Sequence, residues 1–192
     1  MLNEYRRRLA RPVSIPVRAA ALLALTAVFG CADAAEPAAT SDSIATNAPR
    51  AQLNGPAVPT HYSLALTVLP EKDRFDGEVT IDVTLSERVE GLYLHGNNLN
   101  VTRAGVRLAS GASVRASYRQ LTEDGIAYVA FGRPVDAQDI ALEFTYDAPF
   151  DRQLLGLYRV DEDGRSYAFT QFESIFARKA FVSFDEPEHK TP

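Results

Sequence analysis

The chain has 192 residues, of which 46% are hydrophobic and 23% are charged, so it is long enough to bury one sizeable hydrophobic core. Its formal net charge is −5 and its isoelectric point is about 5.2. Nucleic-acid-binding proteins display basic patches that neutralise phosphates, and no such patch is visible in the body of this sequence. We therefore expect no nucleic-acid partner.

The beginning of the chain has the pattern of an export signal. A basic segment precedes the apolar run Ala19–Phe29, and its arginines are Arg6, Arg7, Arg8, Arg11 and Arg18. A basic segment followed by roughly 7 to 15 apolar residues is typical of a secretory signal peptide. Such a run is too short to cross a bilayer as a stable helix. The sequence therefore predicts an exported protein.

The single cysteine, Cys31, follows this apolar run directly. It closes the segment Val28-Phe29-Gly30-Cys31, which resembles the lipobox at which bacterial lipoproteins are cleaved and acylated. We predict a signal peptide with a lipobox over residues 1–31, lipid attachment at Cys31, and a membrane partner reached through the acyl chains. The alternative is an ordinary signal peptide cleaved after Ala32 or Ala34. The first interpretation places the protein in the bacterial cell envelope as a periplasm-facing lipoprotein.

Residues 32–58 have a different composition from the rest of the chain. They are rich in Ala, Pro, Ser, Thr and Asn, contain few aliphatic residues, and show no sustained period. This composition is typical of a flexible linker.

From Tyr62 onward the pattern is that of β-strands. Alternating apolar residues predict strands over Tyr62–Val68 and Gly77–Leu85, and the polar segment Glu71–Asp73 predicts a hairpin turn between them. In the second strand, the odd-numbered residues from Gly77 to Leu85 share one face. A shorter strand, Leu92–His95, leads into a predicted turn at Gly96–Asn98.

Four further strands are predicted around Val101–Leu108, Val114–Leu121, Ile126–Phe131 and Ile140–Tyr146. In the last of these, Ile140, Leu142, Phe144 and Tyr146 fall on one face. No helix of ordinary length is predicted after the linker. Short alternating segments separated by Gly, Asp, Asn and Pro predict an all-β fold, an antiparallel saddle-like β-sandwich.

The residues of a self-contained catalytic site are not recognisable. The three histidines, His61, His95 and His189, are far apart, and the sequence contains no HExxH motif, no GxSxG motif and no glycine-rich phosphate loop. We expect structural roles for His61 and His95, and a solvated position for His189. The sequence thus predicts no catalytic residue and no metal ligand in this chain.

The most informative segment lies near the end. Tyr167–Glu173 is predicted to be a strand that presents Gln171 and Glu173 on the same face. The segments Ala177–Phe181 and Phe184–Pro187 follow, and their interleaved charged and aromatic residues predict a packed, charge-paired loop.

These segments resemble the N-terminal domain of the aminopeptidase N family of zinc metallopeptidases. The similar motifs are Thr170-Gln171-Phe172-Glu173, Ala177-Arg178-Lys179-Ala180-Phe181 and Phe184-Asp185-Glu186-Pro187, together with Gly156-Leu157-Tyr158-Arg159 and Leu92-Tyr93-Leu94-His95. The sequence departs from the family pattern at Ser174, Phe176 and Val182-Ser183. The resemblance covers residues 59–192, and it predicts that this stretch is an N-terminal β domain truncated at its C-terminal edge.

The resemblance implies that the full-length protein removes N-terminal residues from peptides that have a free N-terminus. It implies that Glu173 binds the substrate's α-amino group and that Gln171 lines the pocket for the first side chain or contacts the backbone of the substrate. On the residues alone, a salt bridge from Glu173 to Arg178 or Lys179 remains the alternative. For Arg178, Asp185 and Glu186 we expect structural roles in the loop.

The family's GAMEN and HExxH-x18-E motifs do not occur in these 192 residues. We therefore expect the zinc cofactor to be held by the protein's own C-terminal catalytic domain, and this chain alone to be inactive. Two alternatives stay open. The same β domain could belong to a non-catalytic surface lipoprotein that serves as a binding module, or the parent could hydrolyse a non-peptide substrate.

Overall fold

The structure is a computed structural model that describes residues 41–50 and 52–191. Antiparallel strands dominate this part of the chain, which confirms the predicted all-β fold. The strands are β1 Ala57–Thr67, β2 Arg74–Leu85, β3 Val89–His95, β4 Asn100–Leu108, β5 Ser113–Gln120, β6 Ile126–Val135, β7 Asp139–Pro149, β8 Gly156–Glu162 and β9 Arg165–Gln171. The helices in the same residues are short: α1 Ser41–Thr46 and the 3-10 helices η1 Ala177–Lys179 and η2 Pro187–His189.

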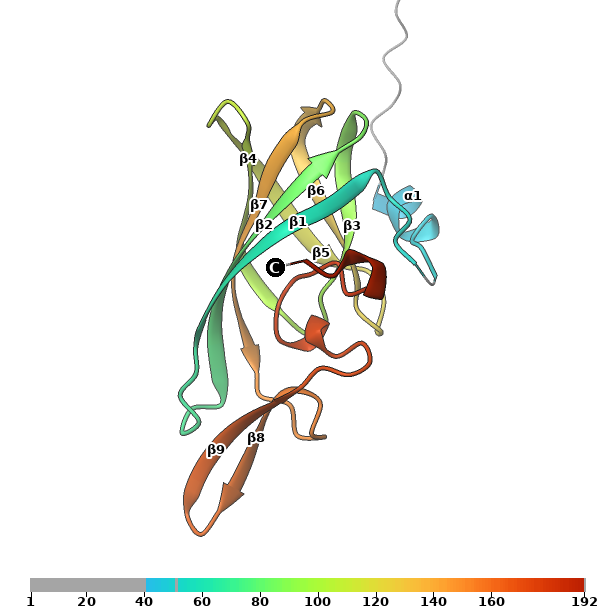
Figure 1. The fold of residues 1–192 in the computed structure, drawn as a ribbon. Coiled ribbons are helices and arrows are strands. Elements are labelled where there is room, and N and C mark those ends of the chain that lie inside the picture. Colours follow the sequence, from blue (N-terminus) through green and yellow to red (C-terminus); the bar gives the residue numbers. More distant parts are fainter. Residues whose placement is uncertain (1–40, 51, 192) are drawn as a thin grey trace, which may run out of the picture. The chain divides into compact units, whose positions relative to one another are not determined.

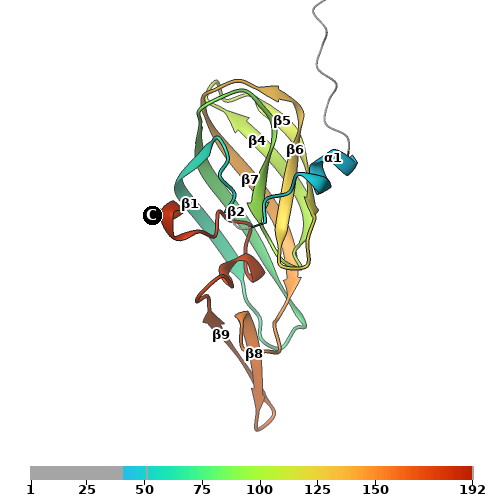
Figure 2. The same cartoon turned by 90° about the vertical axis from the view of Figure 1, so that its right-hand side faces the viewer.

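Seven of these strands form one curled sheet in the order β1-β2-β7-β4-β5-β6-β3 (Figures 1 and 2). Strand β7 lies between β2 and β4, so the sheet is not a simple meander. Strands β8 and β9 form a separate two-stranded sheet. The right-handed twist of the strands accumulates across seven of them, and this curls the large sheet around its buried face.

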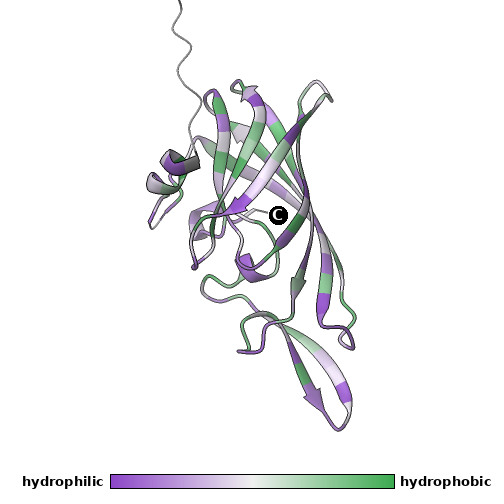
Figure 3. Ribbon diagram, turned by 180° about the vertical axis from the view of Figure 1, so that it is seen from behind, coloured by the Kyte–Doolittle hydropathy of each residue, from purple (hydrophilic) through white to green (hydrophobic). Residues whose placement is uncertain are grey.

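The centre of the large sheet follows the predicted alternation. The odd-numbered residues of β2 from Phe75 to Leu85 are buried, and so are Ile140, Leu142, Phe144 and Tyr146 of β7. The two strands pair so that buried residues face buried residues, as in Val79 opposite Phe144. Figure 3 shows the resulting alternation of hydrophobic and hydrophilic residues along the strands. The two predicted faces are therefore confirmed.

A close contact between β2 and β7 requires a glycine. Gly77 lies opposite Tyr146, and a Cβ atom at Gly77 would overlap the Tyr146 ring. The missing side chain lets the Tyr146 ring lie across β2. Its hydroxyl then reaches the carbonyl oxygen of Ala180, in the segment that follows β9, at 2.8 Å.

The predicted hairpin at the edge of the sheet is confirmed as the pair β1 and β2. Strand β1 begins at Ala57, five residues before the predicted start at Tyr62, because it pairs with β2 up to Leu85. Leu64, one of the alternating apolar residues of the predicted strand Tyr62–Val68, is exposed, whereas Tyr62 and Leu66 are partly buried. An edge strand has a neighbour on one side only, and its alternation is correspondingly less complete.

The described part of the predicted linker contacts both the large sheet and the segment before η2. The hydroxyl of Tyr93 donates a hydrogen bond to the carbonyl oxygen of Ile44 in α1, at 2.9 Å. Leu53 is buried, and its backbone N–H donates to Glu186 Oε1 at 2.6 Å. The sequence did not predict these contacts.

The predicted signal peptide, its lipobox and Cys31 lie outside the described residues. Among the residues that are described, no helix has the length and apolar character needed to span a membrane.

Candidate functional site

The residue Gln171 ends a tight hairpin formed by β8 and β9. Glu162 pairs with Arg165, so the turn consists of Asp163 and Gly164 alone, and both have positive φ angles, 50° and 72°. A two-residue turn of this kind matches the twist of the flanking strands. At the other end of the hairpin, Gly156 pairs with Gln171.

One face of this hairpin is attached to the rest of the domain. Leu157 is buried, and the guanidinium of Arg159 donates to the carbonyl oxygen of Lys72, between β1 and β2, at 2.8 Å. Near the base of the hairpin, Lys179 Nζ forms an ion pair with Asp151 Oδ2 at 2.6 Å. The Arg159 contact fixes the hairpin against the tip of the β1–β2 hairpin.

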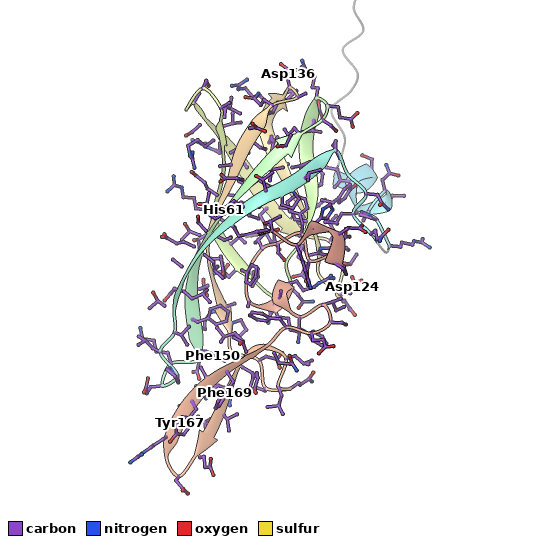
Figure 4. All side chains as sticks on the ribbon, viewed as in Figure 1. His61, Asp124, Asp136, Phe150, Tyr167 and Phe169 are labelled. Atoms are coloured by element: carbon purple, nitrogen blue, oxygen red, sulfur yellow. The ribbon has the colours of Figure 1, made fainter. Side chains whose placement is uncertain are left out.

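The opposite face of the hairpin is aromatic and exposed. Tyr158 and Phe169 stack with their ring centroids 5.7 Å apart, and Tyr167 is also exposed. Figure 4 shows Tyr167 and Phe169 along β9. Because side chains alternate along a strand, Gln171 lies on the same face as Tyr167 and Phe169.

The prediction that a strand presents both Gln171 and Glu173 is wrong in one respect. Strand β9 ends at Gln171, and Glu173 lies in the turn that follows. Gln171 is the last residue of β9 that pairs with β8, and its partner is Gly156. The positive φ of Gly156, 67°, turns the chain that precedes β8 away from β9. Both side chains are exposed, but only Gln171 is placed by the strand, whereas the orientation of Glu173 is set by the turn.

The carboxylate of Glu173 makes no hydrogen bond or ion pair with any described residue. The two basic residues considered as its partners are paired elsewhere: Arg178 with Asp185, and Lys179 with Asp151. In the described part of the chain the salt-bridge alternative for Glu173 is therefore not realised, and the carboxylate remains accessible.

The loop that carries Glu173 is held by aromatic contacts on one side. Phe172 packs edge-on against Phe181 with ring centroids 5.9 Å apart, and Phe181 contacts Tyr62 of β1. The Tyr62 hydroxyl accepts a hydrogen bond from the Phe184 backbone N–H at 3.0 Å. Burial raises the pKa of Tyr62 to about 12, an effect partly opposed by that hydrogen bond, so the phenol stays neutral.

The predicted charge-paired loop is confirmed. Arg178 Nε lies 3.1 Å from Asp185 Oδ2, and the side chains of the two residues are only 8% and 13% exposed. The Arg178 guanidinium also donates to the carbonyl oxygen of Asp124 at 3.1 Å, which ties the loop to the turn before β6. The structural role expected for Arg178 and Asp185 agrees with this geometry.

His95, at the end of β3, fixes the last part of the loop. Its backbone exchanges two hydrogen bonds with Ser183, at 2.8 and 2.9 Å. Its Nδ1 atom accepts a hydrogen bond from the Asp185 backbone N–H at 3.0 Å, which requires the proton of the neutral ring to be on Nε2. Burial, the largest effect, and the positive charge of Arg178 together lower the pKa of His95 to about 4. The structural role predicted for His95 is confirmed, whereas His61 is exposed on β1.

The potential metal ligands in the described residues do not match the family's zinc motif. Three of them, Glu186, Glu188 and His189, lie together at η2. His189 was predicted to be solvated, but its side chain is only 18% exposed and packs against Phe184. This set contains one imidazole rather than the histidine pair of an HExxH helix, so no catalytic step is assigned to it.

Comparison with known proteins identifies a peptidase family. Residues 58–192 match the family model described as the peptidase M1 N-terminal domain. The chain is 32% identical over 146 residues to the thyrotropin-releasing hormone-degrading ectoenzyme of Rattus norvegicus, covering 72% of this chain and 14% of that protein.

Two further relatives carry aminopeptidase names. The chain is 33% identical over 144 residues to the puromycin-sensitive aminopeptidase of Caenorhabditis elegans, covering 70% of this chain and 15% of the relative. It is 29% identical over 137 residues to aminopeptidase N of Lactococcus lactis, covering 69% and 15%. The chain thus spans about one seventh of the length of these relatives. It belongs to the M1 aminopeptidase family, of which residues 58–192 form the N-terminal domain.

Proposed function

We propose that this chain supplies the substrate-anchoring N-terminal domain of a zinc aminopeptidase that removes N-terminal residues from peptides. The observation that carries the proposal is the exposed Glu173 carboxylate, which has no partner among the described residues and lies on a loop fixed by buried contacts. A carboxylate presented in this way is available for a ligand.

The chemistry of the site suits a free α-amino group. A carboxylate forms charge-assisted hydrogen bonds with an ammonium, and these strengthen when a second surface excludes water. The protein's own C-terminal catalytic domain would provide that surface and hold the zinc ion, which would polarise the scissile carbonyl and lower the pKa of a bound water. A peptide blocked at its amine could not make these bonds, so exopeptidase selectivity would follow.

Gln171 is proposed to contact the first residue of the substrate. Its amide offers both a donor and an acceptor, and it lies at the end of β9, two residues before Glu173.

Replacing Glu173 by alanine in the full-length protein is expected to lower kcat/KM for aminoacyl-coumarin substrates by about 10- to 150-fold, since a hydrogen bond to a charged group contributes about 1.5 to 3 kcal/mol. The melting temperature should not change, because the side chain is exposed and has no partner in the described residues. Steady-state kinetics and thermal unfolding of the same preparation measure both effects.

Glu162, an exposed glutamate of β8, provides the matched control, and Glu162→Ala should retain wild-type kinetics. The 192-residue chain alone serves as the blank and should show no chelator-sensitive turnover. If Glu173→Ala lost activity and thermal stability in parallel, Glu173 would have a structural role and the proposal would be wrong.

We also propose that Cys31 carries a lipid anchor that holds the exported protein at the cell envelope, with the domain on the periplasmic side. Labelled palmitate should enter the wild-type protein and should not enter Cys31→Ala when both are expressed in a bacterium that processes lipoproteins. Equal labelling of the two proteins would contradict lipid attachment at this residue.

A further inference from the structure

The 3-10 helix η2 brings three potential metal ligands together. Glu186 is the extended residue that precedes η2, and its Oε2 atom lies 3.5 Å from Nε2 of His189, the last residue of η2. The Glu188 carboxylate lies close to both side chains. One ligand atom from each of the three residues lies within 4.8 Å of the other two.

Glu186 provides a second, independent observation. Its side chain is only 6% exposed, and its Oε1 atom accepts the hydrogen bond from Leu53 N–H. Its Oε2 atom has no hydrogen-bond partner among the described residues and lies 3.5 Å from His189 Nε2. Buried carboxylate oxygens are normally satisfied by a donor or a cation, so this atom points to a missing ligand.

The neighbouring side chains hold these groups in position. The His189 ring packs edge-on against Phe184 with centroids 5.8 Å apart, and the His189 backbone N–H donates to the Glu186 carbonyl oxygen at 3.0 Å. Such contacts around a ligand fix its orientation before a metal binds. His189 and Phe184 also line a cavity of about 330 Å³.

We propose that Glu186 Oε2, a Glu188 carboxylate oxygen and His189 Nε2 bind a divalent zinc ion, with water completing the coordination. One imidazole and two carboxylates suit zinc better than calcium or magnesium, which prefer all-oxygen sites. Two carboxylates this close repel each other, and a dication neutralises both. The site departs from the expectation that this chain has no metal ligand, and it does not depend on the proposed aminopeptidase function.

The test uses the tag-free 192-residue chain, stripped with chelator and dialysed. Zinc chloride is titrated in competition with a chromogenic chelator, and thermal unfolding is followed with and without zinc. We expect one zinc per chain and a higher melting temperature with zinc. Loss of an outer-shell partner already weakens metal binding by about 10- to 100-fold, so Glu188→Gln and His189→Gln should each weaken zinc binding at least as much.

Exposed residues of the sheet provide matched controls. Glu78→Gln in β2 is the control for Glu188→Gln, and His61→Gln in β1 is the control for His189→Gln. Both controls should bind zinc as the wild type does. Calcium and magnesium should not compete at concentrations at which zinc saturates the chain. Absence of saturable zinc binding, or equal binding by His189→Gln and His61→Gln, would overturn the proposal.

Discussion

Replacing Arg178 by alanine is expected to lower the free energy of unfolding by about 3 to 5 kcal/mol, the range measured when one partner of a buried ion pair is removed. The substitution would leave the Asp185 carboxylate, which is only 13% exposed, without its cation. It would also remove the hydrogen bond to the Asp124 carbonyl oxygen. Chemical denaturation of wild type and variant at pH 7 measures the difference.

An exposed ion pair of the same type provides the control. Arg88 Nη1 lies 3.2 Å from Asp136 Oδ1, and these side chains are 67% and 76% exposed. Because exposed pairs contribute about 0 to 1 kcal/mol, Arg88→Ala should change stability little. Equal effects of the two substitutions would show that the Arg178 pair does not hold the loop.

Acidification from pH 7 to pH 4 is expected to remove about 3 kcal/mol of stability through His95 alone. The pKa of His95 is lowered from 6.5 to about 4 in the folded protein, a difference of about 2.5 units at about 1.4 kcal/mol each. A lowered pKa means that the folded state favours the neutral ring. This stabilisation is fully present above pH 6.5 and is lost as the pH falls towards 4.

The surroundings of His95 explain the direction of the shift. Burial has the largest effect, and the nearby charges of Arg178 and His189 also disfavour a second positive charge, whereas Asp124 acts in the opposite direction. A protonated Nδ1 could no longer accept the hydrogen bond from Asp185 N–H.

The His95 effect can be separated from that of the carboxyl groups by substitution. Asparagine at position 95 offers an acceptor oxygen near the place of Nδ1 but does not titrate. His95→Asn should be less stable than wild type at pH 7 and should lose less stability between pH 7 and pH 4. Parallel pH profiles for the two proteins would contradict the assigned role of His95.

The central sheet could be predicted from the sequence because burial on one face imposes a two-residue period. Val79, Ile81, Leu142 and Phe144 recur at that spacing, and each lies where the period places it. A shift of one residue in the strand pairing would move all of these side chains to the solvent face. The alternation in the sequence therefore specifies which face is buried.

The order of the strands could not be predicted in the same way. Strand β7 inserts between β2 and β4, and alternation within a strand does not identify its neighbours. Strand β8 was not predicted either, although Asp163-Gly164 between two strand-forming segments is a strong hairpin signal.

At the candidate site, the sequence predicted that one strand presents Gln171 and Glu173, but the strand ends at Gln171. The period of two continues through Phe172 and Glu173, whereas the ladder stops where Gly156 turns its partner strand away. The contacts that fix the loop join residues far apart in sequence, such as Tyr62 with Phe184 and His95 with Asp185. Neither partner has a local pattern that predicts the other.

Recognition of a peptide's free amine by Glu173 can be measured with two inhibitors of the full-length protein that differ only in acetylation of the α-amino group. The ratio of their inhibition constants is measured for wild type and for Glu173→Gln, which removes the charge and retains the size. Comparing the ratios cancels effects that both inhibitors share.

We expect the wild type to prefer the free-amine inhibitor strongly and Glu173→Gln to reduce this preference by about tenfold or more, because a charge-assisted hydrogen bond is lost. An unchanged preference in the variant would contradict amine recognition by Glu173. It would assign amine recognition to another residue and leave the exposed carboxylate of Glu173 without the proposed function.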